Sequence, residues 1–189
     1  MTVYYKVVRN ILSQEECDQC ADRMNDNKKE SFQDTQCPKS LSFYGFNKDF
    51  VERMKQHAEE IFGQELFYAF DYCRIYPKDE VLKRHLDRTS CQYSVTVNLR
   101  NSDSPWVFFF EHPETGERDS VTMLPGDSVF YMGCLVPHWR EENPSEEVHQ
   151  MFFHFTDEKL HNSIDAIEPE KNTAEQKRNN LKSLFGKKK

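Results

Sequence analysis

The sequence predicts a mostly β protein with N-terminal helices, in which the strands form a double-stranded β-helix, the jelly-roll arrangement that cupins also have. Aromatic residues make up 13% of the 189 residues and include fifteen Phe, which favours a buried β-rich core. From residue 66 onward, short aromatic or β-branched runs are separated by turn residues. No alternation of strands with helices occurs, so a parallel α/β sheet is not expected.

Two helices are predicted ahead of the strands. Residues 13–25 begin with Ser13-Gln14-Glu15-Glu16, which matches a capping box. A second helix is expected between Asn47, which can cap it, and Gly63, a natural stop. Residues 31–44 lack periodicity and are predicted to be a loop, either a flap over a site or an ordinary surface connection. The predicted strands span residues 66–76, 92–99, 106–111, 120–124, 128–132 and 148–155, and the phenylalanines assigned to the core are Phe108, Phe110, Phe130, Phe153 and Phe155.

The predicted domain organisation is one folded unit followed by a tail. Residues 1–157 form the domain, with helical support in residues 1–65 and the jelly-roll core in residues 66–157. The tail, residues 158–189, is basic from Lys171, where seven Lys or Arg against one Glu give +6, although the whole chain carries −7. The preceding residues therefore carry −13, and this acidic body disfavours nucleic acid as the main partner.

Other features indicate where the protein works. No apolar stretch is long enough to span a membrane, and the N-terminus lacks the pattern of a signal sequence, so we expect a cytoplasmic protein without a membrane partner. The six cysteines are then expected to be reduced thiols, and Cys17-x-x-Cys20 lacks the second pair of a zinc ribbon. The sequence leaves the oligomeric state open.

Three residues form a candidate metal site: His85 and Asp87 at the end of a predicted strand, and His138 in a later segment. In an extended segment, side chains two residues apart point to the same face. Two rival pairs are less suitable. His57 and Glu59 lie in a predicted helix, where residues two apart diverge, and the pair in His112-Pro113-Glu114 belongs to a turn. Two imidazoles and one carboxylate suit iron(II) with an open coordination face, although manganese or nickel fits the same ligands.

With these residues in jelly-roll order, the chain resembles the iron(II)/2-oxoglutarate-dependent oxygenases over residues 67–157. The resemblance is strongest to the prolyl-hydroxylase-like group, in Arg74-Ile75-Tyr76-Pro77 and the segment from Lys83 to Arg88. It implies that His85, Asp87 and His138 hold iron(II), that 2-oxoglutarate and dioxygen are cosubstrates, and that ascorbate is a supporting reductant. The reaction implied is hydroxylation of an unactivated C–H bond with release of succinate and carbon dioxide.

The sequence departs from this family pattern in the cosubstrate pocket. Most relatives place an Arg or Lys about nine to twelve residues after the second histidine, to pair with the distal carboxylate of 2-oxoglutarate. Here that stretch, Glu146 to Met151, has neither. Arg140 is the preferred substitute because it lies two residues after His138 and so points to the same face of an extended strand. His149 is the second choice, and Arg74 and Arg88 stay open as alternatives. By resemblance, Tyr76 belongs to the pocket, and Tyr93 is a further inward-facing candidate, although either tyrosine also fits a packing role.

The substrate is less defined. Arg74, Arg88, Trp106 and Trp139 are candidates for substrate contacts. Pairing with surface carboxylates explains the arginines equally well, and the tryptophans fit burial without a functional role better. The preferred substrate is a prolyl residue of a peptide or protein, and the alternative substrate is a small amino-acid-like metabolite. Two other functions stay open: a non-oxidative cupin-like or degenerate binding protein, which the missing late cation favours, and a nucleic-acid demethylase anchored by the tail, which the acidic body disfavours.

Overall fold

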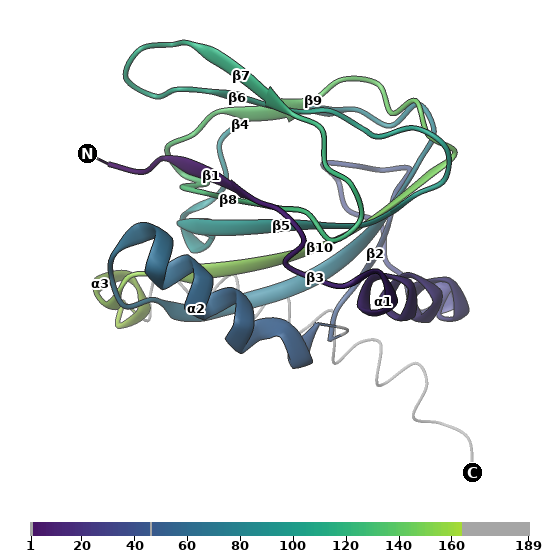
Figure 1. Ribbon diagram of the computed structural model, residues 1–189, viewed down its shortest axis with the longest axis horizontal. Coiled ribbons are helices and arrows are strands. Elements are labelled where there is room, and N and C mark those ends of the chain that lie inside the picture. The colour runs from purple at the N-terminus through teal and green to yellow at the C-terminus, as the bar shows by residue number, and fades with distance from the viewer. Residues whose placement is uncertain (1, 46, 164–189) are drawn as a thin grey trace.

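The fold consists of two antiparallel β-sheets that face each other, as the computed structural model in Figure 1 shows for residues 2–45 and 47–163. The larger sheet has six strands in the order β1-β8-β5-β10-β3-β2, and the smaller has four in the order β4-β9-β6-β7. Consecutive strands repeatedly cross between the two sheets, which is the jelly-roll topology that the sequence predicts. The predicted basic tail from Lys171 lies outside the described residues.

The strands and helices have the following bounds. The strands of the larger sheet are β1 (Tyr5–Val8), β2 (Leu41–Phe43), β3 (Phe67–Pro77), β5 (Tyr93–Asn101), β8 (Ser128–Tyr131) and β10 (Glu147–Thr156). Those of the smaller sheet are β4 (Leu82–His85), β6 (Phe108–Glu111), β7 (Arg118–Val121) and β9 (His138–Arg140). The α-helices are α1 (Gln14–Asp26), α2 (Val51–Phe62) and α3 (Glu158–His161), and short 3-10 turns cover Lys28–Glu30, Lys48–Phe50 and Thr89–Cys91.

Helix α1 forms as the sequence predicts. The Ser13 hydroxyl accepts the Glu16 N–H at 3.2 Å, and the Glu16 carboxylate accepts the Ser13 N–H at 2.8 Å, which completes the capping box. Its buried face consists of Cys17, Cys20, Ala21 and Met24. Together with α2 it covers the outer face of the larger sheet (Figure 1).

Helix α2 confirms the predicted stop but not the predicted start. Gly63 ends it in the left-handed conformation, with φ of +68°, and donates to the Glu59 carbonyl. The expected cap, Asn47, instead precedes a 3-10 turn, and its side chain makes no capping bond. The Asn47 amide donates to the Tyr72 carbonyl at 2.9 Å and accepts from the Cys73 thiol, so this residue ties the helix entry to β3. The prediction of an Asn47 cap was therefore wrong.

Four strands lie outside the six predicted ranges: β4 and β9 of the smaller sheet, and β1 and β2 at the edges of the larger sheet. Strand β1 pairs with β8, and β2 pairs with β3 at residues predicted to be loop. A bridge between Phe32 and Ser42 further fixes that segment. The remaining predicted strands agree with the structure within about three residues at each end.

The apolar core lies mainly between the helices and the larger sheet, with smaller clusters between the two sheets. All five phenylalanines assigned to the core are buried. All six cysteines are free thiols, as expected. Within residues 2–45 and 47–163, none of the helices combines the length and apolar composition needed to cross a membrane.

Candidate metal and cosubstrate site

The pairing of β4 with β9 places His85 directly opposite His138. Asp87 follows β4 by two residues, and its backbone N–H donates to the Gly133 carbonyl at 2.9 Å, which holds this extended segment beside the turn before β9. Residues two apart in an extended segment point to the same face, and β4 pairs with β9. The three predicted side chains therefore point to one place.

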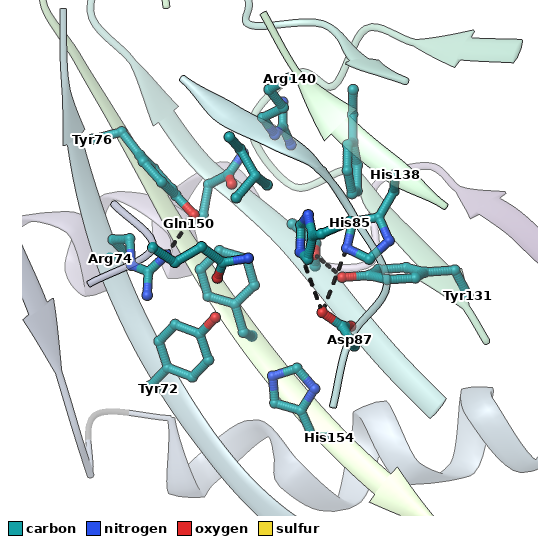
Figure 2. A pocket seen from close by; sticks show the side chains of 15 residues that line it. Tyr72, Arg74, Tyr76, His85, Asp87, Tyr131, His138, Arg140, Gln150 and His154 are labelled. Atoms are coloured by element: carbon teal, nitrogen blue, oxygen red, sulfur yellow. Dashed lines mark hydrogen bonds and ion pairs between the residues drawn. The ribbon is translucent and has the colours of Figure 1, made fainter. Parts of the chain in front are cut away.

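The ligand atoms of these three residues converge. The Nε2 atoms of His85 and His138 both lie 3.5 Å from Asp87 Oδ1, and one ligand atom from each of the three residues lies within 4.8 Å of the others. The Nδ1 atoms approach the Lys83 carbonyl at 2.7 Å and the Val136 carbonyl at 2.9 Å. Because a carbonyl only accepts, each Nδ1–H donates to its carbonyl, and both Nε2 atoms face Asp87 (Figure 2).

Asp87 is held by its own surroundings. The Ser94 hydroxyl donates to Oδ2 at 2.9 Å. A Cβ at Gly133 would overlap Asp87 Oδ2 and would lie 2.5 Å from the Cys91 carbonyl oxygen, so only glycine leaves room for the carboxylate. Burial alone would raise the pKa of Asp87, but hydrogen bonds with His138 and His85 outweigh burial and hold that pKa well below its usual range. The group is an anionic ligand ready for a divalent cation.

The rival pairs do not assemble into comparable clusters within the described ranges. Glu59 pairs with Lys55 and accepts the Leu66 N–H, whereas Glu114 accepts from Tyr4. One second group of metal-ligand type does occur, formed by Asp87, Cys91 and His154. It shares Asp87 with the first group and therefore belongs to the same site.

A pocket of about 370 Å³, including the space at its mouth, extends from this triad between the sheets. In Figure 2 Arg140 and His154 lie at its two ends, the triad lies along one side, and Arg74, Tyr72 and Tyr76 lie along the other. A wider groove of about 870 Å³ shares Gln36 and His85 with the pocket. It offers a route from solvent to the triad.

Arg140 is a buried cation that has no carboxylate partner within residues 2–45 and 47–163. Its guanidinium donates to the Trp106 carbonyl at 2.5 Å and contacts Met123 Sδ at 3.7 Å. It lies over the rings of Trp106 and Phe108, and no carboxylate of the described residues pairs with it. Burial lowers its pKa to about 10, so it remains charged at neutral pH. An unpaired buried charge is costly, and an anion bound in the pocket would relieve that cost.

Tyr76 and Arg74 form the opposite wall. Burial raises the pKa of Tyr76 to about 12, which keeps its hydroxyl neutral and able to donate. Arg74 is 2% exposed, lies 3.4 Å from that hydroxyl and pairs with Asp34 at 3.1 Å. Arg74, Tyr76 and Arg140, all predicted from the sequence as candidate site residues, therefore line one pocket.

Several pocket residues were not predicted, and alternation along two strands could have identified them. On β5, the polar residues Ser94 and Thr96 alternate with apolar Tyr93, Val95 and Val97, and only the polar set faces the pocket side. On β3, Tyr72 points to the same face as Arg74 and Tyr76, and all three line the pocket. The other unpredicted lining residues are Gln36, Leu82, Phe108, Tyr131, Gln150, Phe152 and His154.

Two predicted cosubstrate residues lie elsewhere. His149 faces α1, where its Nε2 lies 3.1 Å from Asn25 Oδ1, and Tyr93 packs against Phe62 of α2. Both belong to the outer face of the larger sheet, so neither side chain faces the pocket and the prediction for both was wrong. The cause is the same for both residues. Each points to one face of its strand, and the pocket residues of that strand point to the other face.

The remaining predicted substrate residues lie around the pocket rather than in its lining. Trp106 is buried beneath Arg140 and donates its indole N–H to the Glu141 carbonyl at 2.7 Å. Trp139 stacks on Phe109 on the face of β9 away from His138. Arg88 is exposed and lies over the Phe70 ring. Trp106 thus has a packing role that positions Arg140.

Comparison with known proteins identifies the fold. No protein-family model and no curated sequence matches the chain. Among solved structures, HygX from Streptomyces hygroscopicus, with nickel and 2-oxoglutarate bound, is similar with a TM-score of 0.65 and 13% identity over 83% of this chain and 84% of that one. A Pseudomonas putida prolyl-4-hydroxylase is similar with a TM-score of 0.62 and 14% identity over 79% and 91% of the two chains.

A third similar structure is a prolyl hydroxylase from Trichoplax adhaerens in complex with a hypoxia-inducible-factor peptide fragment. It has a TM-score of 0.64 and 11% identity over 82% of this chain and 84% of that chain. The chain has the iron(II)/2-oxoglutarate oxygenase fold. At these identities the similarity concerns the oxygenase fold, and the chemistry must be argued from the side chains.

Proposed function

We propose that this protein is an iron(II)- and 2-oxoglutarate-dependent dioxygenase that hydroxylates an unactivated C–H bond. The substrate is a prolyl residue of a peptide or protein, or a small amino-acid-like metabolite. In the overall reaction, one oxygen atom of O2 enters the C–OH product and the other enters succinate, as 2-oxoglutarate loses carbon dioxide. One observation carries the proposal: two imidazoles and a carboxylate converge in a pocket that also contains Arg140, a buried arginine with no carboxylate partner among the described residues.

The triad fits a divalent iron site. His85, Asp87 and His138 would be the protein ligands, because their donor atoms already converge and their other polar atoms are hydrogen-bonded to fixed partners. A donor set of two nitrogens and one oxygen, without thiolate, suits iron(II). When bound, the metal supplies the activation of dioxygen, while the chain keeps the ligands oriented.

Arg140 and Tyr76 are the residues that we assign to 2-oxoglutarate. The guanidinium of Arg140 offers planar donors to a carboxylate, and its position between the Trp106 and Phe108 rings excludes water from the pair. The neutral hydroxyl of Tyr76 can donate to the same ligand. Arg140 would thus replace the later cation that most proteins of this type use.

The similar structures support this class of function and leave the substrate type open. HygX has been solved with nickel, 2-oxoglutarate and hygromycin B, and the Trichoplax adhaerens enzyme with a peptide fragment. The same fold therefore accommodates a small molecule in one protein and a peptide in another.

The decisive test is anaerobic addition of iron(II) and then 2-oxoglutarate to the full chain, followed by visible absorption. We expect the charge-transfer band of a bidentate 2-oxoglutarate complex. His85→Ala should lose the band, whereas Arg140→Gln should retain it at saturation but need about 10- to 100-fold more 2-oxoglutarate, since a charge-assisted pair is lost.

Each failure has a distinct meaning. If the wild type bound iron but gave no band, the oxygenase proposal would be wrong and a non-oxidative binding protein would be favoured. If Arg140→Gln had wild-type affinity, only the assignment of Arg140 would fail. Arg118→Gln is the matched control, because this exposed arginine of β7 lies outside the pocket.

A further inference from the structure

A second buried arginine faces the pocket and is already positioned to bind an anion. The Arg74 Nε–H donates to the Ser42 hydroxyl at 2.9 Å, and its guanidinium lies over the rings of Tyr72 and Tyr76 at 5.1 and 5.5 Å. Burial alone would lower its pKa, but the tyrosine hydroxyls, Cys37 and Asp34 hold that pKa above its usual value. Arg74 is therefore a fixed cation in the pocket wall.

Its carboxylate partner is held much less firmly. Asp34 belongs to the segment between the Lys28–Glu30 turn and β2, and its side chain is 33% exposed, compared with 2% for Arg74. The other oxygen of Asp34 accepts the Gln36 N–H at 2.8 Å, and Gln36 lines the pocket. The ion pair thus joins a rigid wall to a surface segment, so water or a competing carboxylate can reach its Asp34 side.

A flat surface leads from Arg74 toward the metal triad. The Tyr72 ring is stacked with the Phe152 ring at 4.6 Å and with the His154 ring at 5.7 Å, with interplanar angles of 18° and 15°. His154 Nε2 is buried and has no hydrogen-bond partner among the described residues. Stacked rings beside a free polar atom can accommodate a flat or cyclic group that carries a hydrogen-bonding substituent.

We propose that Arg74 binds a carboxylate of the primary substrate, which takes the place of Asp34, and that the substrate is a small ring-containing carboxylic acid. One carboxylate replaces another, so the charge of Arg74 remains compensated. The ring would lie against Tyr72 and His154, between Arg74 and Asp87. This substrate class rests on the proposed function, because the metal that the triad would hold is what makes the bound acid a substrate. The carboxylate site itself can be tested by binding alone.

The test is fluorine NMR of 4-fluorobenzoate added to the full chain loaded with Ni(II) and saturating 2-oxoglutarate, with 4-fluorobenzamide as the uncharged analogue. We expect the benzoate to bind at least about tenfold more tightly than the benzamide. Arg74→Gln should abolish this preference. Asp34→Asn should increase benzoate affinity about tenfold, because it removes the internal competitor. Arg118→Gln, which removes an exposed charge, should behave as the wild type.

Asp34→Asn keeps the test informative if Arg74→Gln fails to fold, since Asp34 lies on an exposed segment. Absence of benzoate binding to the wild type, equal binding of the two analogues, or no gain with Asp34→Asn would overturn the proposal. Should Arg74→Gln remove the iron–2-oxoglutarate band while Arg140→Gln kept wild-type affinity, Arg74 would be the cosubstrate residue. The substrate proposal would then fail while the oxygenase proposal stood.

Discussion

The two faces of β10 are both buried, yet they serve different purposes. On the inner face, Gln150, Phe152 and His154 line the pocket. On the outer face, Met151, Phe153 and Phe155 join the core beneath the helices. Burial alone therefore does not distinguish a site from a core in this sheet. The distinction comes from what each face meets: the smaller sheet with the triad on one side, and α1 and α2 on the other.

The polar residues differ in what surrounds them. Among the described residues, inner-face His154 and Gln150 and outer-face His149 each have a buried polar atom without a hydrogen-bond partner. His154 and Gln150 line the pocket, whereas His149 faces helix α1, where its Nε2 lies 3.1 Å from Asn25 Oδ1. A polar group beside a pocket can be satisfied by a ligand, but one within a core reduces stability. Changes on the inner face should therefore alter binding, and changes on the outer face should alter stability.

The largest expected difference between the faces concerns Phe153 and its neighbour Phe152. Phe153→Ala should reduce the free energy of unfolding by about 3–5 kcal/mol, because it leaves a dry cavity in the core. Metal affinity of the folded protein should not change. Phe152→Ala should cost less stability, since its side chain borders the pocket and water can fill the space. Urea unfolding of the metal-free proteins measures both, and equal losses would contradict the comparison.

The next effect concerns Gly133, which has no side chain beside Asp87. Gly133→Ala should weaken divalent-metal binding about 100-fold, since the added Cβ displaces the carboxylate oxygen from its position. Co(II) titration followed by absorption measures the change. Gly116→Ala, in the loop between β6 and β7, is the matched control and should keep wild-type metal affinity. A Gly133→Ala protein that bound Co(II) normally would show that the triad tolerates displacement of Asp87.

A smaller effect is expected from acid. Burial lowers the pKa of His149 to about 4, against about 6.5 when unfolded. The imidazole is neutral in both states at pH 7, and below about pH 6.5 the unfolded state binds the proton more readily. Stability should thus fall by about 2 kcal/mol between pH 7 and pH 5 on account of His149.

His149→Gln should lose that part of the acid sensitivity. Urea midpoints of the metal-free protein at pH 7 and pH 5 provide the measurement. If the variant lost as much stability as the wild type, the outer-face environment that we assign to His149 would be incorrect.

Most of the fold could be predicted from local patterns, and the missed elements have physical reasons. Ser13, Glu16 and Gly63 are local signals whose effect depends on nearby backbone, so they were interpreted correctly. Strand β2 has only three residues and is defined by its pairing with β3. The role of Asn47 likewise depends on a contact with β3, which is distant in sequence.

The convergence of His85, Asp87 and His138 could be predicted because alternation places His85 and Asp87 on one face and strand order brings His138 beside them. The cosubstrate pocket was harder. His149 and Tyr93 were assigned to the wrong face because both faces of their strands are buried, so hydrophobicity did not indicate which face meets the smaller sheet. The alternation of Ser94 and Thr96 with apolar residues was the available signal.

The central claim is that the triad and Arg140 form one site for a metal and a dicarboxylate, and calorimetric titration of 2-oxoglutarate tests it most directly. With Ni(II) bound, the wild type should bind one 2-oxoglutarate, and affinity should fall at least about tenfold without metal, as linkage between the two ligands requires. The same affinity with and without Ni(II), in the wild type and in Asp87→Ala, would contradict the claim.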